Sequence, residues 1–241
     1  MEESTLYQPV RPGRGVLSDQ VAYQIVDLIA NDQLQVGDRL PPLDELSSYL
    51  GVSRTAVREA IKLLDAWGVV TVKHGVGTFV AGHPEHALTV PFRLSAERSP
   101  ETFAHLHQIR VALEPDIAYL AAGKAQPEQI AQMEEAILRM DRALGDPEKY
   151  IPADVAFHTA LAEATGNALF LLVLRPVIDL LADAMRLSEQ TQGATARGQA
   201  FHRALLAQIK AGEADKAGKT MRSHLDQVWY DIVAQLDHNG R

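Results

Sequence analysis

The sequence predicts a mainly α-helical protein with two domains, an N-terminal winged helix-turn-helix with a small β wing and a C-terminal all-α antiparallel helical bundle. Two observations predict this fold class. Up to about residue 82, short amphipathic segments alternate with glycine and proline and end in two β-branched runs. Beyond about residue 98, apolar residues recur at helical spacing to near the end of the chain, without a strand pattern.

The N-terminal part begins with two predicted helices. The segment LSDQVAYQIVDLIANDQL has apolar residues at helical spacing, which predicts a helix over about 19–31 with Ser18 as its N-cap. The following VGDRLPP run ends this helix, because Gly37 and two consecutive prolines cannot continue it. A short second helix is expected in LDELSSYL, where Gly51 provides the stop.

A third helix is predicted in RTAVREAIKLLDAWG, with Ser53 as its N-cap and Gly68 at its end. Arg54, Arg58 and Lys62 recur every four residues and form one cationic face opposite the apolar stripe. Two β-branched runs, VVTVK and GTFVA, then predict a hairpin. This order is typical of DNA-binding winged helices, in which the third helix enters the major groove. The alternative is an ordinary solvated surface helix.

Composition limits the possible functions. No apolar run approaches the roughly 20 residues that span a bilayer, and the N-terminus lacks the features of a signal peptide, so we expect a cytoplasmic protein. The absence of cysteine excludes thiolate metal sites and thiol catalysis. The net charge of −8 argues against a nucleic-acid partner, and residues 1–82 do not change this, since they hold 7 Lys and Arg against 10 Asp and Glu. DNA binding would therefore rest on local positive charge.

Periodicity and turn residues divide the chain into a flexible N-terminus (1–16), a winged helix-turn-helix domain (17–82), a linker (83–97) and a helical domain (98–238), which is expected to bind a metal and an effector. The linker is predicted from its prolines and its lack of periodicity. Proline and glycine separate the helices expected in the bundle, which are 101–122, 127–144, 147–165, 168–190, 197–211 and 213–236.

The DVAFH segment of the bundle places a carboxylate and an imidazole one helical turn apart. Asp154 and His158 share one face at i,i+4 spacing, and His202 and His224 also lie on the apolar faces of their helices. Single inward histidines are usually hydrogen-bonded core residues, and that alternative stays open for each of them. Together the four side chains form a nitrogen and oxygen set that suits a divalent metal ion, zinc first, with Ni, Mn or Fe as alternatives.

The first helix of the bundle contains the sequence RVALEPD. Arg110 and Glu114 share a face, so Arg110 could bind the carboxylate of a ligand near the metal. The alternative is an ordinary i,i+4 salt bridge between the two residues. Pro115, inside the same helix, predicts either a kink or a freed carbonyl.

The chain resembles the GntR family of bacterial transcription regulators. The resemblance rests on GDRLPPLDELSSYLGVSRTAVREAIKLLDAWGVVTVKHGVGTFV for the winged helix, VSRTAVREA being the most specific piece. The bundle resembles the ligand-binding FCD domain of the FadR subgroup through R-x-x-LEP at 110–115, AD-x-x-FH at 153–158 followed by ATGN, FHRALLAQIKAGE at 201–213 and MRSHL at 221–225.

This resemblance implies a homodimer that binds a short, imperfectly palindromic double-stranded operator, with a metal-dependent pocket for a small organic acid. The implied DNA-binding residues are Ser53, Arg54, Thr55, Arg58 and Lys62 on the third helix, with His74 and Gly75 at the wing tip. The implied metal ligands are Asp154, His158, His202 and His224, and the implied effector-binding residues are Arg110 and Asn167.

One position departs from the family pattern. Many relatives read LPSEREL where this chain reads LPPLDEL, so Asp44 replaces an arginine that reaches DNA from the second helix. A carboxylate at this position is expected to repel phosphate. We therefore expect either a different operator or a lower affinity.

Three functions fit these observations. The first is a DNA-binding transcription regulator, with release of a repressor by a small carboxylate as the expected direction. The second is a metal-dependent enzyme that acts on a small organic acid. In the third, the metal only holds the bundle together. The resemblance to the FadR subgroup implies lactate, gluconate, another sugar acid or a dicarboxylate as the effector, and the sequence does not separate them.

Overall fold

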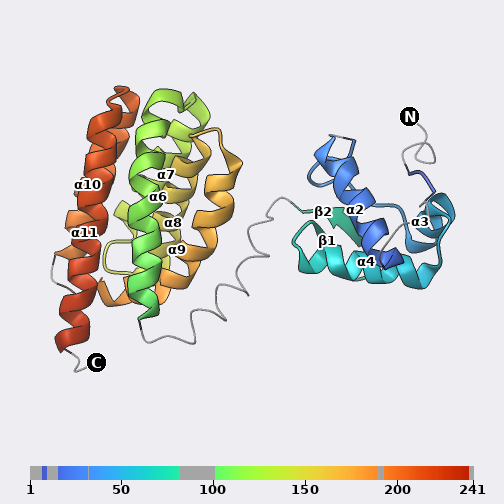
Figure 1. The fold of residues 1–241 in the computed structure, drawn as a ribbon. Helices are drawn as coiled ribbons and strands as arrows, with labels where there is room; N and C mark the ends of the chain where they lie inside the picture. The colour runs from blue at the N-terminus through green and yellow to red at the C-terminus, as the bar shows by residue number, and fades with distance from the viewer. Residues whose placement is uncertain are drawn as a thin grey trace. The chain divides into compact units, whose positions relative to one another are not determined.

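The computed structural model describes residues 7–9, 16–31, 33–81, 101–188, 191 and 193–238. The chain divides into two compact units, Met1–Ala87 and Leu88–Arg241, and both are mainly helical (Figure 1). The predicted linker lies outside the described residues. Among the described helices, none is long and apolar enough to cross a membrane.

The N-terminal unit has the predicted order of elements. Its strands pair antiparallel, with Val70 opposite Val80 and Lys73 opposite Gly77. Apolar side chains from all three helices and from both strands form one core. The winged helix-turn-helix prediction is confirmed in this unit, whose elements are α2 (Leu17–Ala30), α3 (Leu43–Leu50), α4 (Arg54–Ala66), β1 (Val70–Lys73) and β2 (Gly77–Val80).

The predicted N-cap residue is confirmed for α4 and is wrong for α2. Ser53 caps α4, since its side chain accepts a hydrogen bond from the Ala56 N–H at 3.2 Å. The predicted cap at Ser18 is wrong. α2 begins earlier, with Val16 at the N-cap position and no side-chain hydrogen bond, and Ser18 lies within the helix. Ser18 is buried there, past the position from which a side chain caps the first N–H groups of the helix.

Residues 7–9, expected within a flexible N-terminus, contact the winged helix. Tyr7 is buried and stacks on Tyr49 with ring centroids 6.0 Å apart. The Gln24 side chain donates a hydrogen bond to the Gln8 carbonyl oxygen at 2.7 Å. These contacts join the start of the chain to α2 and α3.

The C-terminal unit is the predicted helical bundle, in which long helices run side by side (Figure 1). Short turns connect most successive helices, as expected for antiparallel neighbours. Each described boundary lies within about three residues of its predicted position. The helices are α6 (Thr102–Lys124), α7 (Pro127–Arg142), α8 (Pro147–Glu163), α9 (Ala168–Ser188), α10 (Ala194–Lys210) and α11 (Ala214–His238).

Pro115 lies inside α6 without ending it. A proline has no N–H, so the Val111 carbonyl one turn earlier loses its helical donor. Arg222 of α11 supplies the missing hydrogen bond, because its Nη2 donates to the Val111 oxygen at 3.1 Å. Gly218 allows α11 to come this close, since a Cβ atom there would lie 3.1 Å from the Pro115 carbonyl oxygen. The sequence predicted the freed carbonyl, but not its partner.

Candidate functional site

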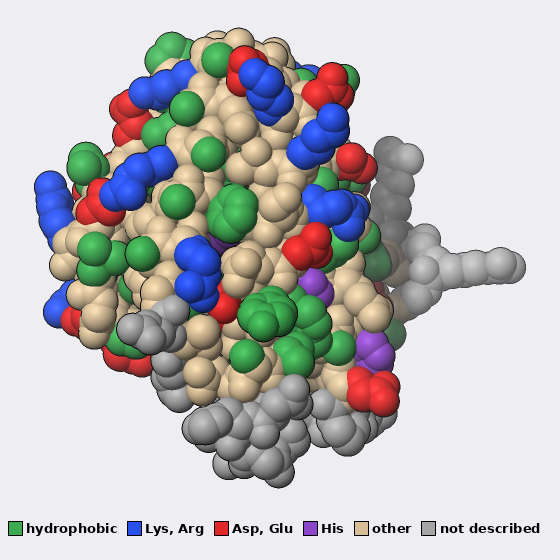
Figure 2. All heavy atoms as spheres, turned by 90° about the vertical axis from the view of Figure 1, so that its left-hand side faces the viewer, with side chains coloured by type: hydrophobic (Ala, Val, Ile, Leu, Met, Phe, Trp, Pro, Cys, Tyr) green, Lys and Arg blue, Asp and Glu red, His purple; other side chains and the backbone are tan. Residues whose placement is uncertain are grey.

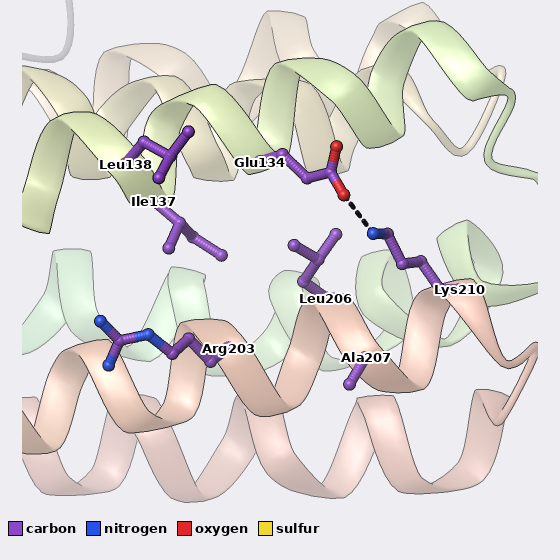
Figure 3. Close-up of a pocket in the computed structure, with 7 residues that line it drawn as sticks. All are labelled: Glu134, Ile137, Leu138, Arg203, Leu206, Ala207 and Lys210. Atoms are coloured by element: carbon purple, nitrogen blue, oxygen red, sulfur yellow. Dashed lines mark hydrogen bonds and ion pairs between the residues drawn. The ribbon is translucent and has the colours of Figure 1, made fainter.

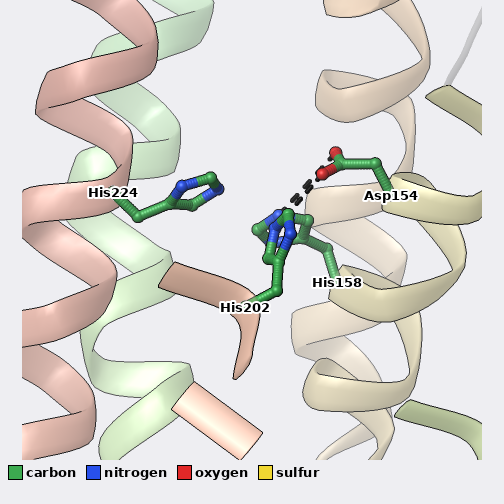
Figure 4. Close-up of side chains that lie close together, drawn as sticks. All are labelled: Asp154, His158, His202 and His224. Carbon is green, nitrogen blue, oxygen red and sulfur yellow. Dashed lines mark ion pairs between the residues drawn. The ribbon is translucent and has the colours of Figure 1, made fainter. Parts of the chain in front are cut away.

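Four polar side chains meet inside the bundle. Asp154 and His158 come from α8, His202 from α10 and His224 from α11 (Figure 4). Each offers one ligand atom, and these atoms all lie within 4.8 Å of one another. All four side chains are buried. The structure therefore brings together the residues that the sequence suggested as a metal-binding set.

The contacts within this cluster leave several polar atoms without a hydrogen bond. His202 Nε2 lies 3.2 Å from Asp154 Oδ1, and His158 Nε2 lies 3.8 Å from Asp154 Oδ2. Neither contact is aligned as a hydrogen bond. Asp154 Oδ2, His202 Nε2 and His224 Nδ1 are buried and find no hydrogen-bond partner among the described residues. Because buried polar atoms are almost always paired, a cation held between them fits the arrangement.

The protonation states also suit a metal ion. Burial lowers the pKa of His202, against the effect of Asp154, and it lowers the pKa of His224 further below its ordinary value. Burial alone would raise the pKa of Asp154, but the nearby His158 and His202 hold that pKa below its ordinary value. Neutral imidazoles with free lone pairs and an ionised carboxylate are the forms that bind divalent metals.

Two residues outside the cluster orient its imidazoles. Glu114 Oε2 lies 2.5 Å from His158 Nδ1, and Gln199 Oε1 lies 3.3 Å from His202 Nδ1. In each ring the other nitrogen, Nε2, is then left facing Asp154. The Gln199 contact is a hydrogen bond of the kind that fixes the tautomer of a metal-binding histidine, whereas the Glu114 contact is a close ion-pair contact that is not aligned as a hydrogen bond. Sequence reasoning missed this role of Gln199, although its position one turn before His202 on α10 is a usable signal.

Gln199 is itself fixed by α7. Its amide Nε2 donates to the Ile137 carbonyl oxygen at 3.1 Å and to Asp141 Oδ1 at 2.7 Å. The amide oxygen is therefore the end that faces His202. This chain of contacts links the cluster to a helix that contributes no ligand.

Arg110 forms an ion pair with Glu114, which is the i,i+4 salt bridge expected as the alternative to ligand binding. Its Nε pairs with Glu114 Oε1, and both side chains are buried. Its Nη2 also lies 3.5 Å from His158 Nε2. Burial would lower the pKa of Arg110 and raise that of Glu114, but their pairing dominates, so both groups keep their charges. Arg110 thus contributes positive charge at the edge of the cluster.

A small cavity of about 20 Å³ lies beside the cluster. This volume holds roughly one water molecule, so an organic acid would require the surrounding side chains to move apart. Polar side chains make up much of the wall, namely Arg110, Tyr150, Asp154, His202, His224 and Asp231. Asn167, the other predicted effector-binding residue, is not among them. Its side chain is exposed and accepts a hydrogen bond from the Leu169 N–H at 3.1 Å.

A larger groove of about 420 Å³ lies between α7 and α10 (Figure 3). Ile137, Leu138 and Leu206 give it an aliphatic lining, and Lys210 pairs with Glu134 at one end. The two cations that line it, Arg203 and Lys210, are already paired with Asp141 and Glu134, and the rest of the lining is mostly apolar. The cluster is the better candidate for a small-molecule site.

The cationic face of α4 is exposed as predicted, but its residues differ in their partners. Arg54 Nε lies 2.6 Å from Asp44 Oδ1, and Lys62 Nζ lies 2.9 Å from Glu59 Oε1. Among the described residues, Arg58 forms no ion pair. It is therefore the cation of this helix most available to phosphate.

The other predicted DNA-binding residues also lie on the surface. Thr55 is exposed on the first turn of α4, whereas the Ser53 hydroxyl is used in the cap. His74 and Gly75 form the exposed turn between the strands, where Gly75 has a φ of 74°. Arg39, which is not among the predicted residues, forms a backbone β-bridge with Phe79 of β2, and its side chain covers Gly77. Arg39 adds an exposed cation beside the wing.

On the side of the bundle formed by α10 and α11, the described residues form no cationic face like that of α4 (Figure 2). Positive and negative side chains are interspersed there (Figure 2). Cations of α10 and α11 pair with nearby acids, Arg203 with Asp141, Lys210 with Glu134 and Lys216 with Glu213. Paired charges of this kind bind a polyanion weakly. On α4, Arg54 and Lys62 are also paired, and Arg58 forms no ion pair among the described residues.

Two family models match this chain, one in the winged helix and one in the bundle. Residues 17–80 match a family described as "Bacterial regulatory proteins, gntR family", and residues 105–227 match the FCD domain. A similar protein in Escherichia coli K12, "Putative L-lactate dehydrogenase operon regulatory protein", is 33% identical over 88% of this chain and 84% of its own length. The regulator LutR of Bacillus subtilis is 31% identical over 88% of this chain and 99% of its own.

A third relative and a solved structure agree with these matches. The transcriptional repressor NanR of Cronobacter sakazakii is 28% identical over 90% of this chain and 85% of its own length. The structure titled Streptococcus agalactiae GntR has 27% identity and a TM-score of 0.71, and it covers 88% of this chain and 98% of that one.

Proposed function

The chain belongs to the GntR family of bacterial regulatory proteins and is a DNA-binding transcription regulator; from this premise we propose that its bundle holds a divalent metal ion and senses a small organic acid. The named relatives are regulators, and the enzyme alternative is therefore set aside. The observation that carries the proposal is the cluster of buried ligand atoms that lack hydrogen bonds.

Asp154, His158, His202 and His224 would hold the metal, with zinc as the first choice among Zn, Ni, Mn and Fe. When bound, the ion supplies positive charge and open coordination positions for the oxygen atoms of an acid. Gln199 would keep the imidazole of His202 in the required tautomer, and the carboxylate of Glu114 lies against His158 Nδ1.

Arg110 would bind the carboxylate of the acid. Glu114 already holds its Nε, which fixes the guanidinium beside the cluster and leaves its terminal amino groups as donors. The cavity is too small for an acid in its present form, so binding has to separate the surrounding side chains. This requirement gives the ligand a means to shift the bundle.

We further propose a homodimer in which two winged helices bind the two halves of an imperfect palindrome. α4 would enter the major groove, and the turn at His74 and Gly75 would contact the backbone or the minor groove. A shift of the bundle would change the spacing of the two winged helices and release a repressor from its operator. This direction follows from the repressor name of one relative.

Acid binding is tested first without DNA, by thermal unfolding of the zinc-loaded and the chelated protein. The panel contains L-lactate, D-lactate, gluconate and succinate. Propane-1,2-diol is the control compound, because it has a hydroxymethyl group in place of the carboxylate of lactate. Lactate is included because the Escherichia coli relative is named for an L-lactate dehydrogenase operon. We expect at least one acid to raise the melting temperature of the zinc-loaded protein only, and the diol to have no effect.

Two results would count against this function. If chelation lowers the melting temperature and no acid raises it, the metal only holds the bundle together. If an acid stabilises the chelated protein as much as the loaded one, the acid binds away from the metal.

A further inference from the structure

Asp44 of α3 and Arg54 of α4 form an ion pair on the surface of the winged helix. The Arg54 Nε atom lies 2.6 Å from Asp44 Oδ1, and the two side chains are 63% and 65% exposed. Asp44 was expected only to repel phosphate. The contact instead makes it a direct partner of the first residue of the helix that is expected to read DNA.

Both residues stand at helix starts, where their charges have opposite effects. Asp44 lies in the first turn of α3, whose N-cap residue Pro42 provides no side-chain hydrogen bond, so a carboxylate there is favourable. Arg54 is the first residue of α4, where a positive charge opposes the helix dipole. Pairing with Asp44 offsets that unfavourable charge and holds the guanidinium at the end of α4.

The contact uses one edge of the guanidinium. The Asp44 carboxylate contacts the guanidinium at Nε, so the N–H groups at the opposite end of the exposed Arg54 side chain can still bind another group. These groups form a planar fork that matches the O6 and N7 acceptors of guanine, the commonest specific contact of arginine in the major groove. A phosphate could use the same fork, but it would meet the nearby carboxylate of Asp44.

We propose that Asp44 is a specificity-determining positioning residue: it holds Arg54 for reading a guanine and disfavours the binding of phosphate by Arg54. Arg58, which lacks an ion pair among the described residues, then supplies the sequence-independent attraction. The proposal depends on the docking of α4 in the major groove, and it is independent of the metal and of the acid.

The test compares binding to two duplexes by the full-length protein. The first duplex is selected by the wild-type protein from a random-sequence pool, and the second is a scrambled duplex of the same length and composition. For Asp44→Asn we expect tighter binding to the scrambled duplex and a ratio of the two dissociation constants that falls about tenfold. Glu45→Gln is the matched control, since it removes an exposed acid from the same turn of α3.

A set of selected duplexes, each with one base pair changed, locates the effect. Asp44→Asn should lose discrimination at the same guanine as Arg54→Ala, and the double variant should lose no more than Arg54→Ala alone. Because exposed ion pairs contribute little to stability, all variants should melt like the wild type. The proposal is overturned if Asp44→Asn and Glu45→Gln leave the ratio equally unchanged, since Asp44 would then only repel phosphate.

Discussion

Replacing Arg58 with alanine is expected to abolish specific DNA binding while leaving the fold and the metal content intact. Arg58 is exposed near the middle of α4 and has no ion-pair partner among the described residues. Because Arg58 is expected to bind phosphate, its loss should weaken binding to every duplex, the selected one included, and a homodimer loses the contact twice. The removed charge should also make the dissociation constant less sensitive to salt.

Fluorescence anisotropy of the labelled, selected duplex over a series of salt concentrations measures both effects. Arg139→Ala is the matched control, because Arg139 is an exposed arginine on α7 of the bundle. It should bind DNA as the wild type does. Normal affinity and normal salt dependence for Arg58→Ala would show that α4 does not dock on DNA as proposed.

Replacing His202 with alanine is expected to lower the metal content and the response to the acid together. His202 contributes an imidazole nitrogen that lies 3.2 Å from Asp154 and makes no hydrogen bond among the described residues. Without it the cluster keeps three possible ligands, which weakens a site of this kind strongly. The winged helix has its own core, so DNA binding should remain.

Elemental analysis after gel filtration gives the metal content, and circular dichroism shows whether the variant is folded. His107→Ala is the matched control, since His107 is a partly buried histidine of the bundle that stacks on Trp229 rather than joining the cluster. Asp154→Asn provides a second variant with an almost unchanged volume. Wild-type metal occupancy in a folded His202→Ala protein would remove His202 from the site.

Much of the fold could be predicted because it depends on local patterns. Apolar residues at helical spacing, with glycine and proline between them, determined the helices and their approximate ends. The same periodicity indicated that His202 and His224 face inward, and both are buried. That the four side chains also lie at one level of the bundle is shown by the structure, in which their ligand atoms lie within 4.8 Å of one another.

The remaining features depend on contacts between residues far apart in the sequence. Gln199 is fixed by Asp141 of another helix, and the carbonyl freed by Pro115 is bonded by Arg222 of α11. Burial of Tyr7 against Tyr49 likewise has no local signature. Helical periodicity reports which face of a helix is apolar, but not which residue of a neighbouring helix lies opposite.

Asp44 illustrates a different limit of sequence reasoning. Its charge predicted repulsion of phosphate, whereas its position beside Arg54 gives that charge a partner. A carboxylate near DNA can weaken binding or direct an arginine toward a base, and only geometry separates the two effects.

The central claim is that an acid bound at the metal releases the protein from DNA. The most direct measurement is the anisotropy of the labelled, selected duplex bound to the zinc-loaded protein during titration with the same panel of acids. We predict that at least one acid returns the anisotropy to the value of free DNA, and that chelation abolishes this effect while the DNA stays bound. Release by the acid from chelated protein, or continued binding with every acid of the panel, would contradict the claim.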